Sequence, residues 1–308
     1  MNFNWKVYLE KYPDLHMITD EKGAYRHYIK YGKRENRTDF DFDFDFISGE
    51  KIQLKCDYFI ATDQHINANP VITNEIKRNP HKWLKIENVV KEDFLLKIFC
   101  YTDILEKNEL HILKNVLSDF VIYFHNSDSP FLMEHYTQLS MLPHCKKIYA
   151  QNNTVKEVST LPIGQANRQW PHGNGNILQQ TIDKKIKKTK SIYLQFSMTS
   201  PKRIVCKEKL NWIEWQGEYK YKEYLETLAQ FEFCVCVEGN GLDTHRFWEC
   251  VYLKVVPICE KNAWTDVVKE IYPMIIVDDW NDLRSTHLHQ IDWEKYTPIL
   301  DIENYFKI

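Results

Sequence analysis

One stretch of the sequence combines glycine, acidic and cationic residues in an order that suits the binding of an anion. It runs from Phe233 to Ile258 and contains the segment Glu238-Gly-Asn-Gly-Leu-Asp-Thr-His-Arg-Phe-Trp-Glu249. Apolar runs on both sides of this segment predict a strand, a glycine-rich turn, a helix and a second strand. Arg246 and Glu249 are three residues apart and therefore share one face of the predicted helix.

Arg246 is difficult to explain by folding alone. A cation in the first turn of a helix is repelled by the positive end of the helix dipole. A bound anion such as a diphosphate would turn this cost into an advantage. Asp243 or Thr244 is a suitable N-cap, and the backbone of Gly239–Gly241 can approach a ligand closely because glycine has no Cβ. We therefore predict an anion site at the start of this helix.

A second cationic segment follows the predicted strand Ser191–Phe196. It contains Ser197 and, a few residues later, Lys202 and Arg203. Hydroxyl and cationic side chains directly after a strand are suited to hold a phosphate or a sugar.

The elements that must position these residues are those of an α/β protein. Apolar runs without alternation predict parallel strands that are covered on both faces. In such sheets the ligand lies beyond the carboxyl ends of the strands. Asp63 follows a predicted strand at Asp57–Thr62, and His125 and Asp128 follow another at Phe120–Phe124. These three residues are the candidate acid–base groups.

Composition describes an ordinary globular protein. The chain has 308 residues, of which 44% are hydrophobic and 27% charged, and this length is sufficient for two domains. A net charge of -3 gives no indication of nucleic acid or an anionic membrane as a partner. The first residues lack a signal pattern, and no apolar run approaches about 18 residues, so we expect a soluble, cytoplasmic protein without a transmembrane segment.

The eight cysteines are scattered and form no Cys-x-x-Cys pair. We interpret them as buried, reduced thiols and assign no metal to them.

The N-terminal residues 1–37 predict a small module of two short helices. Thr19-Asp20-Glu21 is a helix start signal, Gly32 is a stop signal, and His27 has the helical spacing of a packed residue. The next segment, Asp39–Phe46, alternates aspartate and phenylalanine. It contains the Asp-x-Asp pattern of some metal-binding transferases, but strict alternation favours a linker or an edge strand.

Pro, Gly and Asn between Thr160 and Gly173, followed by the basic run Lys184–Lys190, predict a crossing between two domains. A membrane contact of the basic run is the alternative to a solvated linker. The predicted division is residues 1–37, 38–165, 166–290 and a helical tail, 291–308.

An ordered set of motifs resembles the exostosin-like glycosyltransferases of bacteria and large DNA viruses. In the second half the resemblance is carried by the segment from Glu238 to Glu249, then Val-Val-Pro-Ile258 and Ile-Ile-Val-Asp-Asp-Trp280. In the first half it is carried by His-Asn-Ser-Asp128, Ala-Gln-Asn152, Leu-Pro-Ile-Gly164 and Trp-Pro-His-Gly173. The N-terminal module is similar to one attached to many bacterial and viral glycosyltransferases.

This resemblance implies the GT-B fold, with two Rossmann-like lobes, and an inverting transfer of a sugar from a nucleotide-diphosphate donor to a glycan hydroxyl. It implies no cofactor and no metal, with a UDP- or GDP-linked donor as substrate. Arg246, with Lys202 or Arg203, would stabilise the leaving diphosphate. Glu249 would accept from the ribose, and Glu238 would lie near the donor sugar or the helix entry. The remaining donor-side residues are Ser197, Gly239, Gly241 and Asp243.

The acceptor base is left open between Asp128, Asp63 and His125, with Asp128 as the first candidate. Asp128 is equally well explained as a turn-capping residue before Ser129-Pro130. Two rival functions also remain: a fucosyltransferase-like enzyme that uses a GDP-sugar, and an inactive protein that binds a nucleotide or a carbohydrate. The sequence leaves the donor sugar, the acceptor and the oligomeric state open.

Overall fold

The computed structural model describes most of the chain, namely residues 5, 8–9, 12–32, 34–35, 37, 46–85, 88–107 and 109–307. Contacts divide the chain into two compact units. The smaller unit comprises Met1–Phe44 and Thr62–Pro80, and the larger comprises Asp45–Ala61 and His81–Ile308. The Asp-Phe repeat lies outside the described residues except for Phe46.

The smaller unit contains the predicted N-terminal helix. Helix α2 (Glu21–His27) is capped by Asp20, whose side chain accepts a hydrogen bond from the backbone of Gly23 at 2.7 Å. It continues as a π-helix that ends at Gly32, so the start and stop signals in the sequence are confirmed. His27 contacts the hydroxyl of Tyr8 through Nδ1 at 3.0 Å and is packed, as its spacing predicted.

Two further helices belong to the smaller unit. Helices α4 (Asp63–Ala68) and α5 (Pro70–Arg78) were assigned to the first lobe by the sequence analysis. The structure groups them with the N-terminal module, because α5 contacts the 3-10 helix at Pro13–Leu15. The helical module is therefore larger than residues 1–37.

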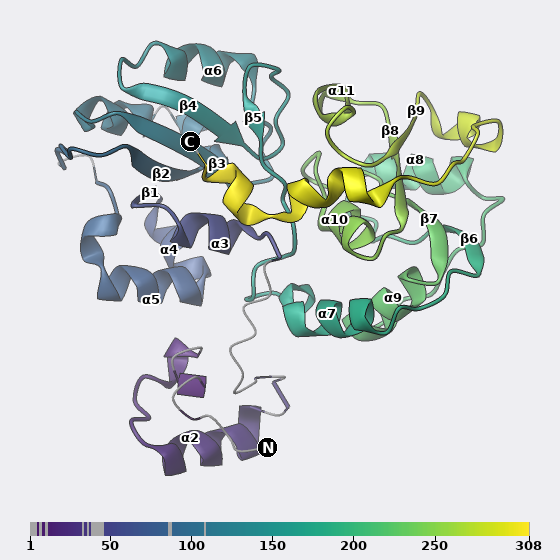
Figure 1. Cartoon of the computed structure of the whole chain (residues 1–308), viewed down its shortest axis with the longest axis horizontal. Helices are drawn as coiled ribbons and strands as arrows, with labels where there is room; N and C mark the ends of the chain where they lie inside the picture. The colour runs from purple at the N-terminus through teal and green to yellow at the C-terminus, as the bar shows by residue number, and fades with distance from the viewer. Residues whose placement is uncertain are drawn as a thin grey trace. The chain divides into compact units, whose positions relative to one another are not determined.

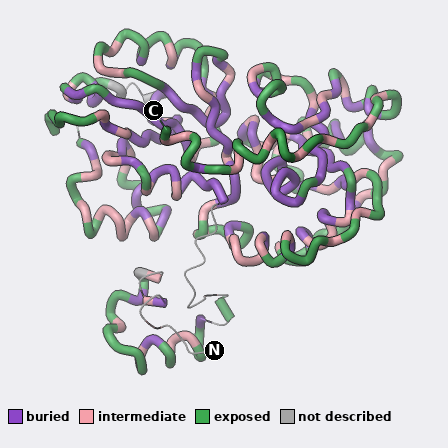
Figure 2. The backbone as a smooth tube through the Cα atoms, in the orientation of Figure 1, coloured by how far each residue is buried: buried purple, intermediate pink, exposed green. Residues whose placement is uncertain are grey.

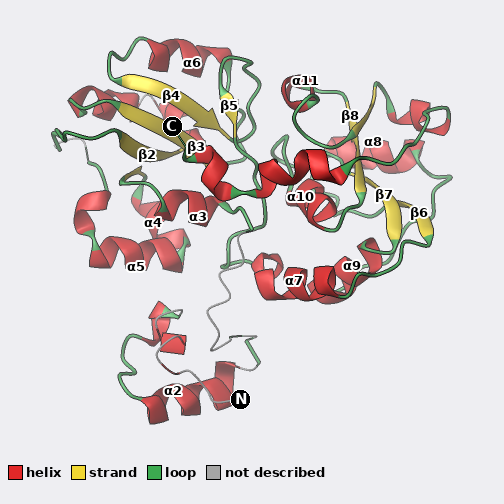
Figure 3. Cartoon of the chain, in the orientation of Figure 1, coloured by secondary structure: helices red, strands yellow, loops and turns green. Residues whose placement is uncertain are grey.

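The larger unit contains a five-stranded parallel sheet in its first half (Figure 1). Its strands follow chain order and are β1 (Tyr58–Ile60), β2 (Leu96–Tyr101), β3 (Phe120–His125), β4 (Cys145–Ala150) and β5 (Ser159–Thr160). Helices α3 (Gly49–Leu54) and α6 (Met133–Ser140) lie on opposite sides of this sheet (Figure 3). The chain between β2 and β3 forms two 3-10 helices, Thr102–Lys107 and Glu109–Asn115.

A second parallel sheet of four strands occupies the other half of this unit. Its strands are β6 (Lys190–Tyr193), β7 (Phe231–Val235), β8 (Val256–Glu260) and β9 (Ile275–Val277). The helices of this half are α7 (Gly175–Asp183), α8 (Pro201–Lys209), α9 (Tyr221–Leu228), α10 (His245–Tyr252) and α11 (Ala263–Val268). Two 3-10 helices at Pro171–Gly173 and Trp280–Arg284 complete it.

The predicted α/β class with two parallel sheets is confirmed, and burial explains it. All six residues of β3 are buried, as are most residues of β2, β7 and β8, and Figure 2 shows the burial along the backbone. Strands covered on both faces need apolar side chains at every position, which is the unbroken pattern in the sequence. In both sheets the described strands follow chain order, without the reversal that marks a doubly wound sheet.

The C-terminal tail returns to the first sheet (Figure 1). Its 3-10 helices are Trp293–Leu300 and Ile302–Tyr305. Tyr123 of β3 donates a hydrogen bond to the carbonyl of Tyr305 at 3.1 Å, and its ring stacks on Phe306 at 4.7 Å. Glu303 forms an ion pair with Lys55 at 2.5 Å. The tail therefore links the two halves of the larger unit.

The segment before the crossing to the second sheet requires a glycine. Gly164 has a φ of +65°, and a Cβ there would lie 2.1 Å from the carbonyl oxygen of Ile47. Among the described helices, none combines the length and apolar character that a membrane span requires.

We expect Gly164→Ala to destabilise the protein by more than about 2 kcal/mol, because it adds both a left-handed backbone strain and a steric clash. Gly217→Ala is the matched control, since the nearest atom to its added Cβ would be 3.6 Å away. Urea unfolding measures both variants. Equal stability of the two would contradict the close approach of Ile47 and Gly164.

Candidate functional site

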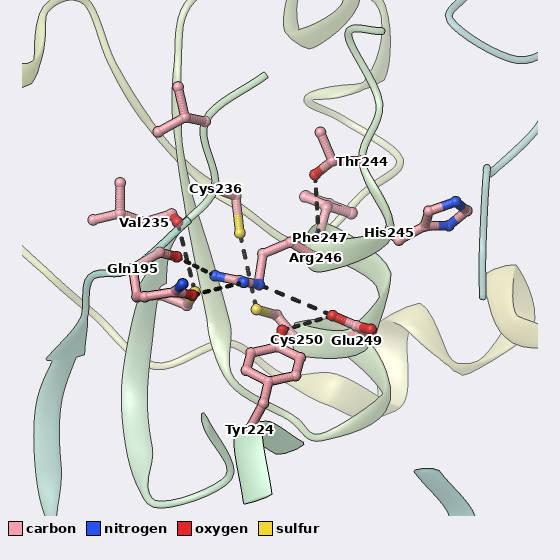
Figure 4. A network of polar contacts seen from close by, with 12 residues as sticks. Gln195, Tyr224, Val235, Cys236, Thr244, His245, Arg246, Phe247, Glu249 and Cys250 are labelled. Carbon is pink, nitrogen blue, oxygen red and sulfur yellow. Dashed lines mark hydrogen bonds and ion pairs between the residues drawn. The ribbon is translucent and has the colours of Figure 1, made fainter. Parts of the chain in front are cut away.

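Arg246 lies where the sequence predicted it, in the first turn of α10 (Figure 4). Its Nη1 donates to the carbonyl of Gln195 at 2.5 Å, and its Nη2 donates to the side-chain oxygen of Gln195 at 3.3 Å. The guanidinium also lies over the rings of Tyr224 and Tyr193, at 4.6 and 5.4 Å from their centroids. Gln195 follows β6, so Arg246 connects the carboxyl end of that strand with the start of α10.

Glu249 shares a helix face with Arg246, as predicted, and the two charged groups are 3.9 Å apart. Its Oε2 accepts a short hydrogen bond from the hydroxyl of Tyr224 at 2.6 Å (Figure 4). The side chain is only 6% exposed, and burial raises its pKa to about 7. This environment indicates that Glu249 is an internal partner of Arg246, and it does not favour the predicted role of Glu249 as an acceptor for a ribose hydroxyl.

Arg203 on α8 is the second guanidinium of the site. It donates to the carbonyls of Glu238 at 3.0 Å and Ser197 at 2.8 Å, which follow β7 and β6. Burial, and after it the charge of Arg246, lower the pKa of Arg203. Two guanidiniums that repel each other at the ends of adjacent strands form a place where an anion is stabilised.

The structure separates the two cations that the sequence left as alternatives. Lys202 is 61% exposed and its ammonium contacts the side chain of Glu238 at 2.5 Å, whereas Arg203 is held by main-chain carbonyls. Glu238 also accepts from the amide of Asn262 at 3.1 Å. A Cβ on Gly239 would lie 3.0 Å from Nη2 of Arg203, so glycine leaves room for that guanidinium. Arg203 is therefore the better second cation.

The start of α10 confirms the second of the two N-caps considered. Thr244 is the N-cap and accepts from the backbone of Phe247 at 3.4 Å. Asp243 is 2% exposed and accepts hydrogen bonds from the backbone of Ile163 at 2.7 Å and from the indole of Trp248 at 2.9 Å. Burial raises the pKa of Asp243 to about 7. Its carboxyl therefore contacts the segment after β5 inside the protein. The predicted contact of Asp243 with the nucleotide-sugar donor is not supported, because the side chain is buried.

His125 ends β3 and is 1% exposed. Its Nδ1 accepts from the backbone of Asn126 at 2.7 Å, which leaves the proton on Nε2, and this nitrogen donates to the carbonyl of Pro162 at 3.0 Å. Burial lowers the pKa of the imidazole to about 4. Both nitrogens are engaged, so the geometry favours a structural histidine over an acceptor base.

Asp128 and Asp63 are both exposed, but they belong to different units. Asp63 begins α4 in the smaller unit. Asp128 lies in the loop after β3, and its carbonyl accepts from the amide of Asn152 at 3.4 Å. The side-chain oxygen of Asn152 accepts a hydrogen bond from the backbone N–H of Asp243 at 2.8 Å. Asp128 is therefore the candidate base that lies next to the loop leading into α10.

No protein-family model matches this sequence, and no curated protein shows significant similarity to it. The geometry of the site therefore carries the functional argument.

Three polar residues, Asn152, Gln195 and Tyr224, have roles that only the structure reveals. A signal existed for the first two, because each lies two residues after the end of a parallel strand. No such signal exists for Tyr224, since helical spacing does not reveal that its hydroxyl contacts a buried carboxylate.

Seven of the eight cysteines are buried, as predicted, and Cys145 is intermediate. Three of them are closer together than the sequence suggested: the sulfurs of Cys234, Cys236 and Cys250 lie within 4.8 Å of one another. Thiolates in such a group can bind soft metal ions. Burial raises the pKa of the Cys236 and Cys250 thiols, whereas the hydrogen bonds of these two thiols and the charge of Arg246 outweigh burial at Cys234 and lower its pKa.

A surface pocket of about 480 Å³ lies on residues other than those of the candidate site. It is lined by Glu208, Lys209, Asn211, Trp212, Asn281 and Arg284, and the guanidinium of Arg284 covers the ring of Trp212 at 5.1 Å. None of the predicted site residues lines it.

We expect Glu249→Gln to become more stable relative to the wild type as pH rises from 5 to 8. The carboxyl has an ordinary pKa of 4.5 when unfolded and about 7 when folded. Below pH 4.5 it is protonated in both states, so its contribution is fully present; this contribution is lost as pH rises towards 7. The difference amounts to at most about 3 kcal/mol.

The measurement is the melting temperature of both proteins across this pH range. A difference in melting temperature that stays constant with pH would show that Glu249 has an ordinary pKa and is not shielded from water.

Proposed function

We propose that this chain is an inverting glycosyltransferase of the GT-B type. It would transfer a sugar from a nucleotide-diphosphate donor to a hydroxyl of a glycan acceptor. The observation that carries the proposal is the pair of partly buried guanidiniums, Arg203 and Arg246, at the carboxyl ends of β6 and β7.

The surroundings of the two arginines are those that a diphosphate needs. Arg203 is oriented by main-chain carbonyls and Arg246 by Gln195, so both cations are held in place before a ligand binds. Pre-organised donors stabilise developing charge without rearrangement during the reaction. Gly239 allows the backbone of its loop to lie close to Arg203. These features support a role in which the site binds the donor diphosphate and stabilises it as it leaves.

The bond changes follow from this arrangement. The carboxylate of Asp128 would take the proton of the acceptor hydroxyl, and the acceptor oxygen would attack the anomeric carbon from the face opposite the diphosphate. The bond from that carbon to the diphosphate oxygen breaks, and the electron pair leaves on the diphosphate. Arg203 and Arg246 neutralise that charge, which is the task a metal ion has in other transferases.

Asp128 supports this assignment by its exposure and by its loop. The carboxylate is exposed, so it is accessible to an acceptor. Its loop is hydrogen-bonded through Asn152 to Asp243, two residues from the glycine-rich turn. The position of this loop suits a base that acts on an acceptor bound beside the donor.

We expect a thermal-shift panel of UDP, GDP, CMP and dTDP to identify one nucleoside diphosphate that stabilises the protein. Arg203→Ala and Arg246→Ala should each reduce that shift by at least half, because each removes one cation from the diphosphate. Lys269→Ala, which removes an exposed cation at the end of α11, is the control and should keep the full shift. Full shifts in both arginine variants would refute the diphosphate site.

We expect Asp128→Asn to lower the turnover of sugar transfer by a factor of about 100 or more, with nucleotide binding unchanged. Asp266→Asn, at an exposed position on α11, is the control and should retain full turnover. Turnover is measured as release of the nucleoside diphosphate in the presence of a glycan acceptor library, with and without EDTA. Turnover of Asp128→Asn within a few-fold of the wild type would place the base elsewhere, and loss of activity in EDTA would contradict neutralisation by arginine alone.

A further inference from the structure

Asn152 has an unusual backbone conformation for a buried residue. It lies two residues after the end of β4, is fully buried, and has a φ of +51°. Residues other than glycine are rarely left-handed, and asparagine tolerates this conformation better than most. A strained and buried conformation persists only where the surrounding contacts require it.

The side chain of Asn152 satisfies backbone groups of two loops at once. Its Nδ2 donates to the carbonyls of Ser127 at 3.1 Å and Asp128 at 3.4 Å, in the loop after β3. Its Oδ1 accepts from the backbone N–H of Asp243 at 2.8 Å, in the loop that leads into α10. Carbonyls only accept and an N–H only donates, so these partners fix the orientation of the amide.

The main chain of Asn152 holds the same loop at its other end. Its carbonyl accepts from the backbone N–H of Phe131 at 3.0 Å. The loop from residue 126 to residue 130 is thus attached to one residue at both of its ends. Gly241 leaves room for this contact, because a Cβ there would lie 2.8 Å from Nδ2 of Asn152.

We propose that Asn152 is a positioning residue for sugar transfer. Its amide fixes the loop that carries Asp128 against the loop that leads to Arg246, so the base and the leaving-group site are held at a set separation. The catalytic part of this inference rests on the proposed function. The connection between the two loops rests only on the contacts of Asn152, and it can be tested without any activity.

Two substitutions test the Nδ2 and Oδ1 contacts of Asn152 separately. Asn152→Asp has nearly the same shape and keeps an oxygen for the N–H of Asp243, but it sets a second oxygen against the carbonyls of Ser127 and Asp128. Asn152→Gly accepts the left-handed backbone and removes both contacts. Asn240→Asp is the control, because it adds the same charge at an exposed position of the glycine-rich turn.

Hydrogen–deuterium exchange of peptides that cover residues 126–131 and 238–244 tests the connection. We expect Asn152→Asp to speed exchange at least tenfold in residues 126–131 only, and Asn152→Gly to speed it in both segments. Asn240→Asp should leave residues 126–131 as in the wild type. Wild-type exchange of both segments in both Asn152 variants would overturn the proposal.

Kinetics test the catalytic consequence separately. With the nucleotide-sugar that gives turnover, Asn152→Asp should lower kcat at least tenfold while the dissociation constant of the nucleoside diphosphate changes less than threefold. If Asn152 served only stability, its substitution would lower the melting temperature but would not reduce kcat while leaving nucleotide binding nearly unchanged. A kcat within twofold of the wild type would overturn the positioning role.

Faster exchange in the variants, together with a wild-type chain that transfers no sugar, would refute the proposed function and leave the connection between the loops standing.

Discussion

The buried carboxyl of Asp243 is the interaction on which the arrangement of the site depends. A carboxyl removed from water is costly unless its oxygens are hydrogen-bonded, and here they accept from the backbone of Ile163 and the indole of Trp248. One partner lies in the segment after β5 and the other in α10. Satisfying this one group therefore aligns the start of α10 with the first sheet, and Arg246 is three residues further along the chain.

Neighbouring contacts strengthen the same alignment. His245 contacts the carbonyl of Gly164 through Nδ1 at 2.8 Å, and the hydroxyl of Tyr252 accepts from the backbone of Ile47 at 3.0 Å. Both residues belong to α10, so this helix is fixed to the first half of the unit at its beginning and at its end. The helix that carries Arg246 therefore also connects the two halves of the unit. Sites on rigid elements hold their groups more accurately than sites on free loops.

The sequence was sufficient for the fold class, for most strands and for the face that Arg246 shares with Glu249. Unbroken apolar runs and helix caps are local signals, and they predict local elements well. The 3-10 helices between β2 and β3 could not be identified as such, because apolar spacing does not distinguish a short 3-10 helix from an α-helix. The contacts group α4 and α5 with the N-terminal module, and this grouping could not be predicted because it depends on contacts with residues far away in the sequence.

The site could be predicted only in part, for a related physical reason. Residue type and spacing indicated Arg246 at a helix start, and they left Arg203 as an alternative to Lys202 and Asp128 as an alternative to Asp63 and His125. They did not reveal that Glu249 would be buried against Tyr224 or that both nitrogens of His125 would be engaged. Burial and hydrogen-bond partners arise from tertiary packing, and they distinguish an available carboxylate or imidazole from an internal one.

The most direct test of the central claim is a calorimetric comparison of a nucleoside diphosphate with the corresponding monophosphate. If Arg203 and Arg246 together bind a diphosphate, the diphosphate should bind at least tenfold more tightly, and Arg246→Ala should abolish most of that preference. Equal affinity for the two nucleotides, or a preference that Arg246→Ala leaves unchanged, would contradict the account.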